Sequence, residues 1–441
     1  MPTFSIENFG CRATEADASA IRRNLRADGL TQVSEHGAAD FVVLNTCTVT
    51  AAADTQAREA IRKIHRANPG ARIVVTGCYA QRAPEELAAA EGVSWVVGNS
   101  HQTEIPRLIR QTTDFVPLAK IQDGEMSLAR GPAKILTADI FAQVTLPISS
   151  PSHDPSDRTR PILKIQDGCN NRCSYCVIPF VRGRSRSLAP DAVLHEVQDL
   201  VASGAKEIVL SGINLGSYGR DLAPRASLAD VVQRILDETA LDRLRFSSIE
   251  PQDLTEDFVA LVASSDRLAP HFHVPLQSGS DRILHAMHRW YRTEHYAERV
   301  NLIRRRLAYP AIGADVIVGF PGETEEDFRA TAEFIERLPF TYLHVFSFSE
   351  RPGTEAAKLA SKAVPGPAIR ERARTLRALA ESKASAFRAS QAGRALRALT
   401  LARGGDDWTE ALTGNYLNVR VAGRHPANEW HDVTIRLGSS S

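Results

Sequence analysis

Short apolar runs alternate with longer amphipathic stretches over the first hundred residues of the chain. The amphipathic stretches, such as TEADASAIRRNLRADG (14–29), have helical spacing of their apolar positions and end near glycine. Strands alternating with helices predict a parallel sheet with helices packed on it, and we expect this α/β domain over residues 1–115. Three apolar runs have the length and composition of buried strands: FVVLN (41–45), ARIVVTG (71–77) and SWVVG (94–98).

A second series of strand and helix signals follows SSPSHDPSDRTRP (149–161), which has the Ser, Pro and Asp content of a linker. We assign residues 116–160 to a connecting segment and residues 161–390 to a core domain. Six strand–helix units predict a partial barrel, (β/α)6, because a complete one has eight. The six strand candidates are ILKIQ (162–166), EIVLSG (207–212), LRFSSIE (244–250), HFHVPLQ (271–277), IGADVIVGF (312–320) and YLHVFSFS (342–349).

The C-terminal part of the chain changes character again. Residues 366–403 read as one long basic helix, with nine Arg or Lys against two Glu, which is either a solvated face or an RNA contact. The alternating stretches GNYLNVRVAG (414–423) and HDVTIRLG (431–438) predict strands of a small β-barrel, which we place at 391–441. The fold class is therefore α/β with a small C-terminal β-barrel.

Composition places the chain among ordinary globular proteins of two or three domains, with 441 residues, 43% hydrophobic and 24% charged. The net charge is only +1, so a polyanionic partner would have to be met by a local patch. The N-terminus has no signal-peptide pattern, and no run approaches the ~20 apolar residues of a membrane span. We expect a cytoplasmic protein without a membrane partner or an obligate protein partner.

Three of the six cysteines come just after predicted strands: Cys11, Cys47 and Cys78. Sites in open α/β sheets lie beyond the carboxyl ends of the strands, so these three thiols are expected to converge. The alternatives are three buried, unreactive thiols or, for the even total, disulfides. In a large reduced protein, clustered cysteines are more often ligands or catalysts than disulfides.

The other three cysteines share one loop, DGCNNRCSYCVIPFVRGRSRS (167–187), directly after the first predicted barrel strand. Cys169, Cys173 and Cys176 are separated by three and then two residues, and no second cysteine pair follows as in a zinc site. Thiolates favour iron–sulfur clusters, and three of them leave one iron of a 4Fe–4S cluster open. The spacing therefore predicts a cluster whose fourth ligand is exchangeable, at the catalytic rim of the barrel.

A barrel strand followed by Cys-x3-Cys-x2-Cys resembles the radical S-adenosylmethionine (SAM) superfamily. Nearly end to end, the chain resembles the methylthiotransferase family within it. The resemblance is carried by the cysteine loop and by SSIEP (247–251), HVPLQSGSDRIL (273–284), ADVIVGFPGETEEDF (314–328) and HVFSFSERPGTEAA (344–357).

The resemblance implies two 4Fe–4S clusters. The one on Cys169, Cys173 and Cys176 would bind SAM and cleave it to a 5′-deoxyadenosyl radical with an electron from a donor protein. A second, auxiliary cluster on Cys11, Cys47 and Cys78 would carry the sulfur. The terminal barrel resembles the family's RNA-binding TRAM domain. The family commonly has Asn three residues after the first cysteine, whereas this chain has Thr14, which puts in doubt only the local hydrogen bonding.

The implied activity is transfer of a methylthio group, a transferase reaction on tRNA. LSGINLGSYGRDL (210–222) and HRWYRTEHYAERV (288–300) look most like the members that act on N6-threonylcarbamoyladenosine at position 37 of tRNA. Other members act on isopentenyladenosine in tRNA or on an aspartate of a ribosomal protein. A rival of another class is a non-enzymatic RNA-binding iron–sulfur protein, which needs a fourth protein ligand at each cluster. His271, His273 and His285 are the candidates for such a ligand.

Two further groups of residues are candidates for binding. The first resembles the SAM-contacting rim of the superfamily, although its glycines could simply form a tight turn. Its members are Glu250, Gln277, Gly319, Gly322 and Glu323. The second, Arg182, Arg184 and Arg186, could hold tRNA phosphates or a substrate carboxylate, or could belong to a solvated turn.

Overall fold

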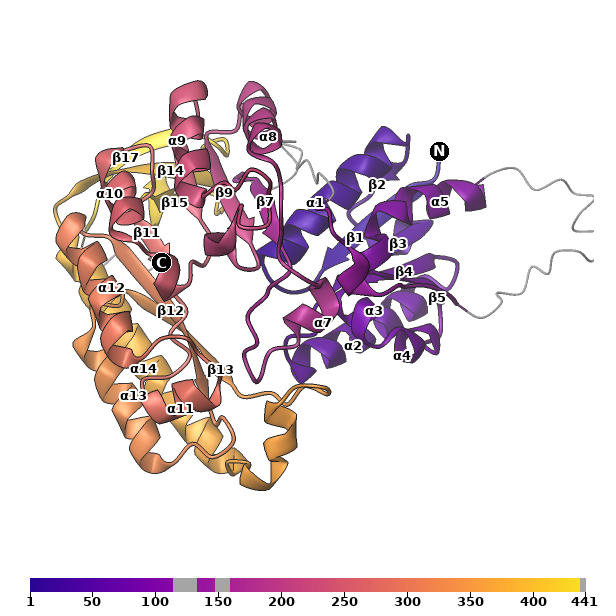
Figure 1. Ribbon diagram of the computed structural model, residues 1–441. Coiled ribbons are helices and arrows are strands. Elements are labelled where there is room, and N and C mark those ends of the chain that lie inside the picture. The colour runs from indigo at the N-terminus through magenta and orange to yellow at the C-terminus, as the bar shows by residue number, and fades with distance from the viewer. Residues whose placement is uncertain (114–132, 147–158, 437–441) are drawn as a thin grey trace, which may run out of the picture. The chain divides into compact units, whose positions relative to one another are not determined.

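The computed structural model describes residues 1–113, 133–146 and 159–436 (Figure 1). The chain forms two compact units. The first contains the N-terminal residues up to Pro151 together with Asp167–Asn170 and Cys176–Arg184. The second contains Ser152–Gln166, Asn171–Tyr175 and the chain from Ser185 onward. Most of the predicted connecting segment (116–160) lies outside the described residues.

The first unit is built on a parallel six-stranded sheet with the order β2-β1-β3-β4-β5-β6. The three predicted strands are confirmed as β3, β4 and β5. The strands are β1 (Thr3–Asn8), β2 (Thr31–Gln32), β3 (Phe41–Thr46), β4 (Arg72–Gly77), β5 (Val93–Gly98) and β6 (Lys134–Leu136). The helices are α1 (Arg12–Ala27), α2 (Ala51–Ala67), α3 (Cys78–Arg82), α4 (Pro84–Ala88), α5 (Ile105–Thr113) and α7 (Ile178–Arg182).

Both faces of this sheet are buried. Val42 and Leu44 of β3 pack in a cluster with Ile61 of α2, whereas Phe41 and Val43 of the same strand pack in a second cluster with residues of α1 and α5. Successive side chains of a strand point to opposite faces, so a continuous apolar run such as FVVL serves both layers of helices.

The second unit contains the predicted partial barrel. Its six main strands are parallel and fall in two hydrogen-bonded groups, β10-β9-β7-β8 and β11-β12-β13, which isolated parallel bridges from Leu244 to Leu268 and from Ser248 to His273 connect. The strands are β7 (Ile162–Asp167), β8 (Arg186–Ser187), β9 (Glu207–Gly212), β10 (Arg243–Phe246), β11 (His271–His273), β12 (Ala311–Val318) and β13 (Tyr342–Ser347).

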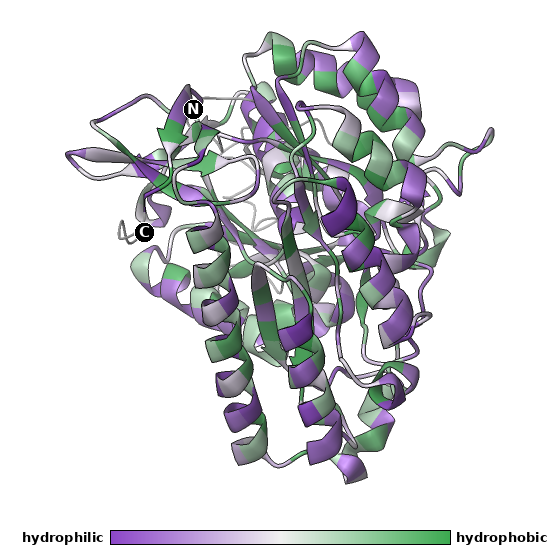
Figure 2. Cartoon of the chain, turned by 90° about the vertical axis from the view of Figure 1, so that its left-hand side faces the viewer, coloured by the Kyte–Doolittle hydropathy of each residue, from purple (hydrophilic) through white to green (hydrophobic). Residues whose placement is uncertain are grey.

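Amphipathic helices separate the barrel strands, and Figure 2 shows hydrophobic and hydrophilic residues alternating along the long helices. Two of these helices begin with a capping box, in which Ser227 and Thr324 each exchange hydrogen bonds with an Asp three residues later. The helices are α8 (Pro190–Ala202), α9 (Leu228–Glu238), α10 (Glu256–Ser264), α11 (Asp281–Ala286), α12 (Thr293–Arg306), α13 (Glu325–Arg337) and α14 (Gly366–Ser390). Among the described residues, no helix combines the length and apolar character needed to cross a bilayer.

The C-terminal residues form an antiparallel sheet of order β16-β15-β14-β17, in which β16 and β17 lie on the two stretches predicted as strands. The strands are β14 (Ala395–Gly404), β15 (Trp408–Thr413), β16 (Asn418–Ala422) and β17 (Trp430–Thr434). The prediction of one helix over 366–403 is wrong beyond Ser390. Gly393 has a φ of 77°, which ends the helical path, and Ala398 and Leu399 are buried in the sheet.

A buried charge cluster joins the barrel to the C-terminal sheet. Glu207, the first residue of β9, is fully buried and pairs with Arg160, Arg243 and Arg245, at 3.2, 3.2 and 2.7 Å. Arg245 also donates to the carbonyl oxygens of Thr413 and Gly414, and Arg243 to that of Arg397. One carboxylate therefore holds the arginines that bind the backbone of the C-terminal sheet.

Candidate functional site: two cysteine triads

Three cysteines of the first unit follow three adjacent parallel strands, as predicted. β1, β3 and β4 are neighbours in the sheet, and Cys11, Cys47 and Cys78 come three, one and one residues after their carboxyl ends. Thr46 pairs with Gly77, so Cys47 and Cys78 follow directly from one rung of the sheet. All six cysteines of the chain are free thiols, which contradicts the disulfide alternative.

The turns that carry these cysteines are closely packed. A Cβ placed on Gly10 would lie 3.2 Å from the Sγ of Cys47, which brings the backbone beside Cys11 next to the second thiol. Gly77 has a φ of 96°, and a Cβ there would lie 2.3 Å from the carbonyl oxygen of Thr46. Glycine at these positions lets the two turns approach each other.

We expect Gly77→Ala to lose the metal site of these cysteines. The side chain would meet the Thr46 backbone and add about 1–3 kcal/mol of strain, which displaces Cys78 from Cys47. Iron content per chain should fall by about half, since one of two clusters is lost. Gly204→Ala is the matched control because its φ is 97° and its Cβ would meet nothing within 4 Å. Equal iron content in Gly77→Ala and the control would contradict this account.

The environment of the three thiols suits a metal cluster. Cys47 and Cys78 are buried and Cys11 is exposed. Burial, together with the nearby Cys78 and Cys11 sulfurs, raises the pKa of Cys47 to about 12. Burial also raises the pKa of Cys78, against the lowering effect of Arg182. Buried thiols this close to one another stay protonated alone, and binding iron would displace the protons and use all three sulfurs.

Thr14, where the family commonly has Asn, stabilises the turn of Cys11. Its hydroxyl donates to the carbonyl oxygen of Cys11 at 2.7 Å, and its own carbonyl accepts from Nδ2 of Asn45 at 2.6 Å. The second contact ties the start of α1 to the end of β3, one strand residue before Thr46. The contact with Asn45 uses the main chain of residue 14, so only the hydroxyl contact with Cys11 depends on threonine at this position.

Arg182 lies beside this triad and is buried, with 1% of its surface exposed. Its Nε donates to the Sγ of Cys78 at 3.3 Å, and its other nitrogens pair with Asp17 and Asp167. The prediction that Arg182 contacts RNA from the surface is therefore wrong. Arg186, in the short strand β8, is also buried, whereas Arg184 is exposed and its contact with RNA or substrate stays a prediction.

The loop that carries Cys169, Cys173 and Cys176 follows β7, as predicted, and all three thiols are partly exposed. The backbone N–H of Cys169 donates to the carbonyl oxygen of Gly183, which closes the loop onto the end of α7. In the first unit, Cys78 packs in one buried cluster with Val177 and Val181. Val177 is the residue after Cys176, so α7 connects the two triads.

Arg289 repeats the contact of Arg182 at the second triad. Its Nη1 donates to the Sγ of Cys173 at 3.3 Å, and its Nη2 forms an ion pair with Glu250. Burial raises the pKa of Glu250, although Arg289 lowers it. Sequence analysis did not single out Arg289, because nothing in the local sequence shows that it reaches a cysteine 116 positions away.

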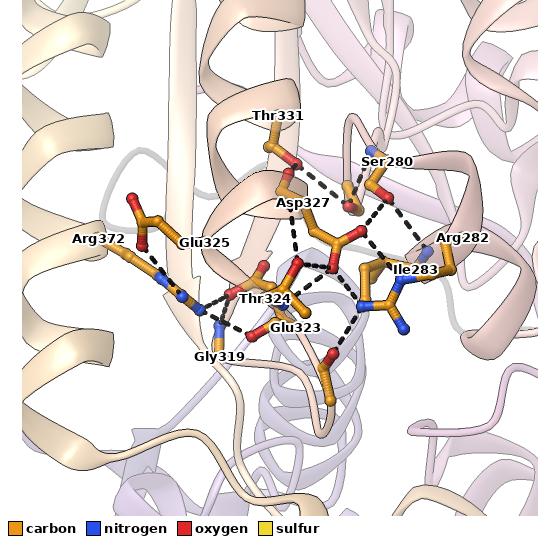
Figure 3. Close-up of polar contacts among 12 residues, drawn as sticks. Ser280, Arg282, Ile283, Gly319, Glu323, Thr324, Glu325, Asp327, Thr331 and Arg372 are labelled. Carbon is orange, nitrogen blue, oxygen red and sulfur yellow. Dashed lines mark hydrogen bonds and ion pairs between the residues drawn. The ribbon is translucent and has the colours of Figure 1, made fainter.

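The predicted SAM residues in the turn after β12 belong to a hydrogen-bonded network (Figure 3). The carboxylate of Glu323 accepts from the backbone N–H of Gly319 at 2.8 Å and from Arg372 of α14 at 2.7 Å. Gly319 and Gly322 have φ values of 80° and 84°, as the tight-turn alternative requires. The turn is therefore present, and contact with SAM stays a prediction for these residues.

Gln277 adopts a φ of 67°, which is rare for a residue with a side chain, and it pairs with Val316 of β12. Strained backbone of this kind clusters at ligand sites, which supports its predicted role. Two of the three histidines considered as extra cluster ligands have other partners, His271 and His273. His271 hydrogen-bonds the hydroxyl of Tyr342, and His273 pairs with Asp315 at 3.0 Å. His285 lies in α11.

Comparison with known proteins agrees with this geometry. Residues 3–98 match the uncharacterized protein family UPF0004, and residues 163–335 match the radical SAM superfamily. The chain is 37% identical to threonylcarbamoyladenosine tRNA methylthiotransferase MtaB of Aquifex aeolicus, over 95% of this chain and 96% of that protein. It is 38% identical to MtaB of Bacillus subtilis, over 81% and 76% of the two chains.

Other relatives have a different named product. The tRNA-2-methylthio-N(6)-dimethylallyladenosine synthase of Syntrophobacter fumaroxidans is 36% identical over 84% of this chain and 78% of that protein. Among solved structures, the radical SAM methyltransferase TsrM of Kitasatospora setae aligns with a TM-score of 0.57 at 17% identity, over 81% and 77% of the two chains, which shows a shared fold. On this evidence the chain belongs to the radical SAM methylthiotransferase family, whose members use SAM and 4Fe–4S clusters.

Proposed function

We propose that this enzyme converts N6-threonylcarbamoyladenosine at position 37 of tRNA to its 2-methylthio derivative. The observation that carries the proposal is the arrangement of the two triads. Cys11, Cys47 and Cys78 follow three adjacent strands, and α7 packs Cys78 against the residue after Cys176. A methylthio transfer to an unactivated carbon needs both a radical source and a sulfur carrier within reach of one base. Two of the relatives described above, from Aquifex aeolicus and Bacillus subtilis, carry the threonylcarbamoyladenosine name.

The residues of the chain would hold the reacting groups. Cys169, Cys173 and Cys176 would hold one 4Fe–4S cluster and Cys11, Cys47 and Cys78 the other. When bound, the clusters and SAM supply the electron, the radical and the sulfur. Arg289 would fix Cys173 against the carboxylate of Glu250, and the strained backbone of Gln277 would present its side chain at the rim of the barrel.

The tRNA would be bound through local positive charge, since the net charge is near zero. Arg184 is exposed on the loop after α7, and Arg370, Arg374 and Arg377 are exposed on α14. The C-terminal sheet adds an arginine over an aromatic ring, Arg420 at 4.4 Å from the centre of Trp408. These groups suit phosphate contacts, which position a nucleic acid without reading its sequence.

The nucleoside product tests the proposal. Purified enzyme would be incubated anaerobically with SAM, a reductant and one of two tRNAs, carrying either threonylcarbamoyladenosine or isopentenyladenosine, and the digested nucleosides would be analysed by mass spectrometry. We expect a mass increase for one methylthio group on threonylcarbamoyladenosine alone. A product only on isopentenyladenosine would assign the enzyme the activity named for the Syntrophobacter fumaroxidans relative. SAM cleavage without product on either tRNA would contradict both substrates.

A further inference from the structure

Arg182 is buried among charged groups that the methylthio transfer itself does not require. It ends α7, and 1% of its surface is exposed. Its Nη2 donates to Asp17 of α1 at 2.8 Å, and its Nη1 lies 3.0 and 3.1 Å from the two oxygens of Asp167. Asp17 is as deeply buried as Arg182. A guanidinium and two carboxylates are thus enclosed together, which costs several kcal/mol per ion unless they are paired.

The remaining nitrogen of Arg182 points to a cysteine. Nε donates to the Sγ of Cys78 at 3.3 Å, within the range of a hydrogen bond to sulfur. The charge of Arg182 also acts on the sulfurs of Cys47 and Cys11. An arginine stays protonated in proteins, so this positive charge is permanent. All three cysteines of the triad therefore lie in the field of one fixed cation.

A purely structural role would explain the ion pairs with Asp17 and Asp167, since they link α1, the end of β7 and α7. A structural role would not explain why Nε of Arg182 donates to the sulfur of Cys78. Hydrogen bonds to cluster sulfurs and nearby positive charge both favour the reduced form of an iron–sulfur cluster, which carries one more electron. The negative charges of Asp17 and Asp167 disfavour the reduced form. Arg182 and the two carboxylates therefore shift the reduction potential in opposite directions.

We propose that Arg182, with Asp17 as its counter-charge, sets the reduction potential of the cluster held by Cys11, Cys47 and Cys78. Arg182 is a positioning residue in this proposal: it raises the potential by donating to Cys78 and by its charge, and Asp17 limits that rise. The inference rests on the proposed cluster ligands and not on the tRNA substrate. Its measurement is therefore independent of the nucleoside assay.

The experiment measures one cluster by itself. The full chain with Cys169, Cys173 and Cys176 all changed to Ala would be reconstituted anaerobically with iron and sulfide, which leaves the triad of the first unit. Its midpoint potential would be read from an EPR-monitored titration, and iron per chain would be determined for each variant. The variants are Arg182→Gln, Asp17→Asn and the double variant.

We expect Arg182→Gln to lower the midpoint potential, because it removes a positive charge and the Nε–H donor. Asp17→Asn should raise it, because the neutral amide still accepts from Arg182 but no longer opposes the cluster charge. The double variant should lie close to the parent. Arg289→Gln is the matched control, since it also removes a buried arginine, but one whose sulfur contact is with Cys173, which this background already lacks, and it should leave the potential unchanged.

Shifts of the same sign in both single variants, or no shift at all, would overturn the proposal and leave Arg182 a structural residue. Gln at 182 leaves two buried carboxylates without their cation, so Arg182→Gln risks losing its iron through misfolding. In that case the double variant tests the role of Arg182, because it removes one positive and one negative charge and leaves the net charge of the cluster of residues unchanged. Its potential must be lower than that of Asp17→Asn alone, and an equal potential would refute the role of Arg182.

Discussion

Cys173→Ala is expected to abolish both SAM cleavage and the methylthio product. Three thiolates hold three of the four irons of a cubane cluster, and a cluster with two protein ligands does not assemble stably. Iron per chain should fall from about eight to about four atoms, as one of two clusters is lost. The measurements are iron content, SAM consumption with reductant, and nucleoside mass spectrometry on the same preparation.

Two further variants, Cys47→Ala and Arg172→Ala, serve as comparisons for Cys173→Ala. Cys47→Ala should also abolish the product and lower the iron content per chain by half. It should retain SAM cleavage because the loop after β7 is intact. Arg172→Ala, an exposed change in the same loop, should keep the full iron content and SAM cleavage. Full product from any variant that lacks one of the six cysteines would refute the assignment of two clusters.

Glu207→Gln is expected to have the largest effect on stability. Glu207 is fully buried and is the common partner of Arg160, Arg243 and Arg245. The change leaves three buried or half-buried cations without their counter-charge, and breaking a buried pair in this way costs about 3–5 kcal/mol. Since these arginines hold the backbone of β14 and β15, the C-terminal sheet should loosen first. Hydrogen exchange resolved along the chain and urea unfolding would measure both effects.

The same residue makes stability depend on pH. Burial alone would raise the pKa of Glu207, but Arg245, Arg160 and Arg243 lower it to about 2, below the ~4.3 of an unfolded chain. A depressed folded-state pKa means that the stabilisation is complete above pH ~4.3 and is lost as the pH falls towards about 2.

The stability gap between the native chain and Glu207→Gln should therefore narrow as the pH is lowered from about 5 to about 3. The control is Glu238→Gln, which removes an exposed i, i+4 pair with Arg234 and is expected to change stability little. A gap that stays constant with pH, or an equal loss in Glu238→Gln, would contradict the account of the buried cluster.

Local patterns predicted the elements well where burial follows a simple period. The apolar runs at 41–45 and 71–77 became β3 and β4, because strands covered on both faces need continuous β-branched residues. The wrong prediction of a helix over 395–403 is also explained by burial in a sheet. The stretch ALRALTLAR has helical propensity in isolation, but burial of Ala398 and Leu399 in the antiparallel sheet outweighs it.

The arginines of the cysteine loop show the limit of reading charge from spacing. Arg182, Arg184 and Arg186 alternate as if on one exposed strand, yet the first ends a helix and the last begins a short strand. Only Arg184 is exposed. A carboxylate partner removes an arginine from the surface, and Asp17 lies 165 positions away from Arg182 along the chain.

The sequence by itself determined the alternation of strands and helices in the two α/β regions, the positions of Cys11, Cys47 and Cys78 just past strands, and the loop with three thiols within eight residues. These features depend on the spacing of apolar, polar and cysteine residues that are close together in the sequence. Only the tertiary structure decided that Arg182 and Arg289 donate to Cys78 and Cys173, that Thr14 and Asn45 fix the turn of Cys11, and that α7 packs on Cys78. Such contacts join residues distant along the chain, and their energies depend on burial and distance, which no local pattern records.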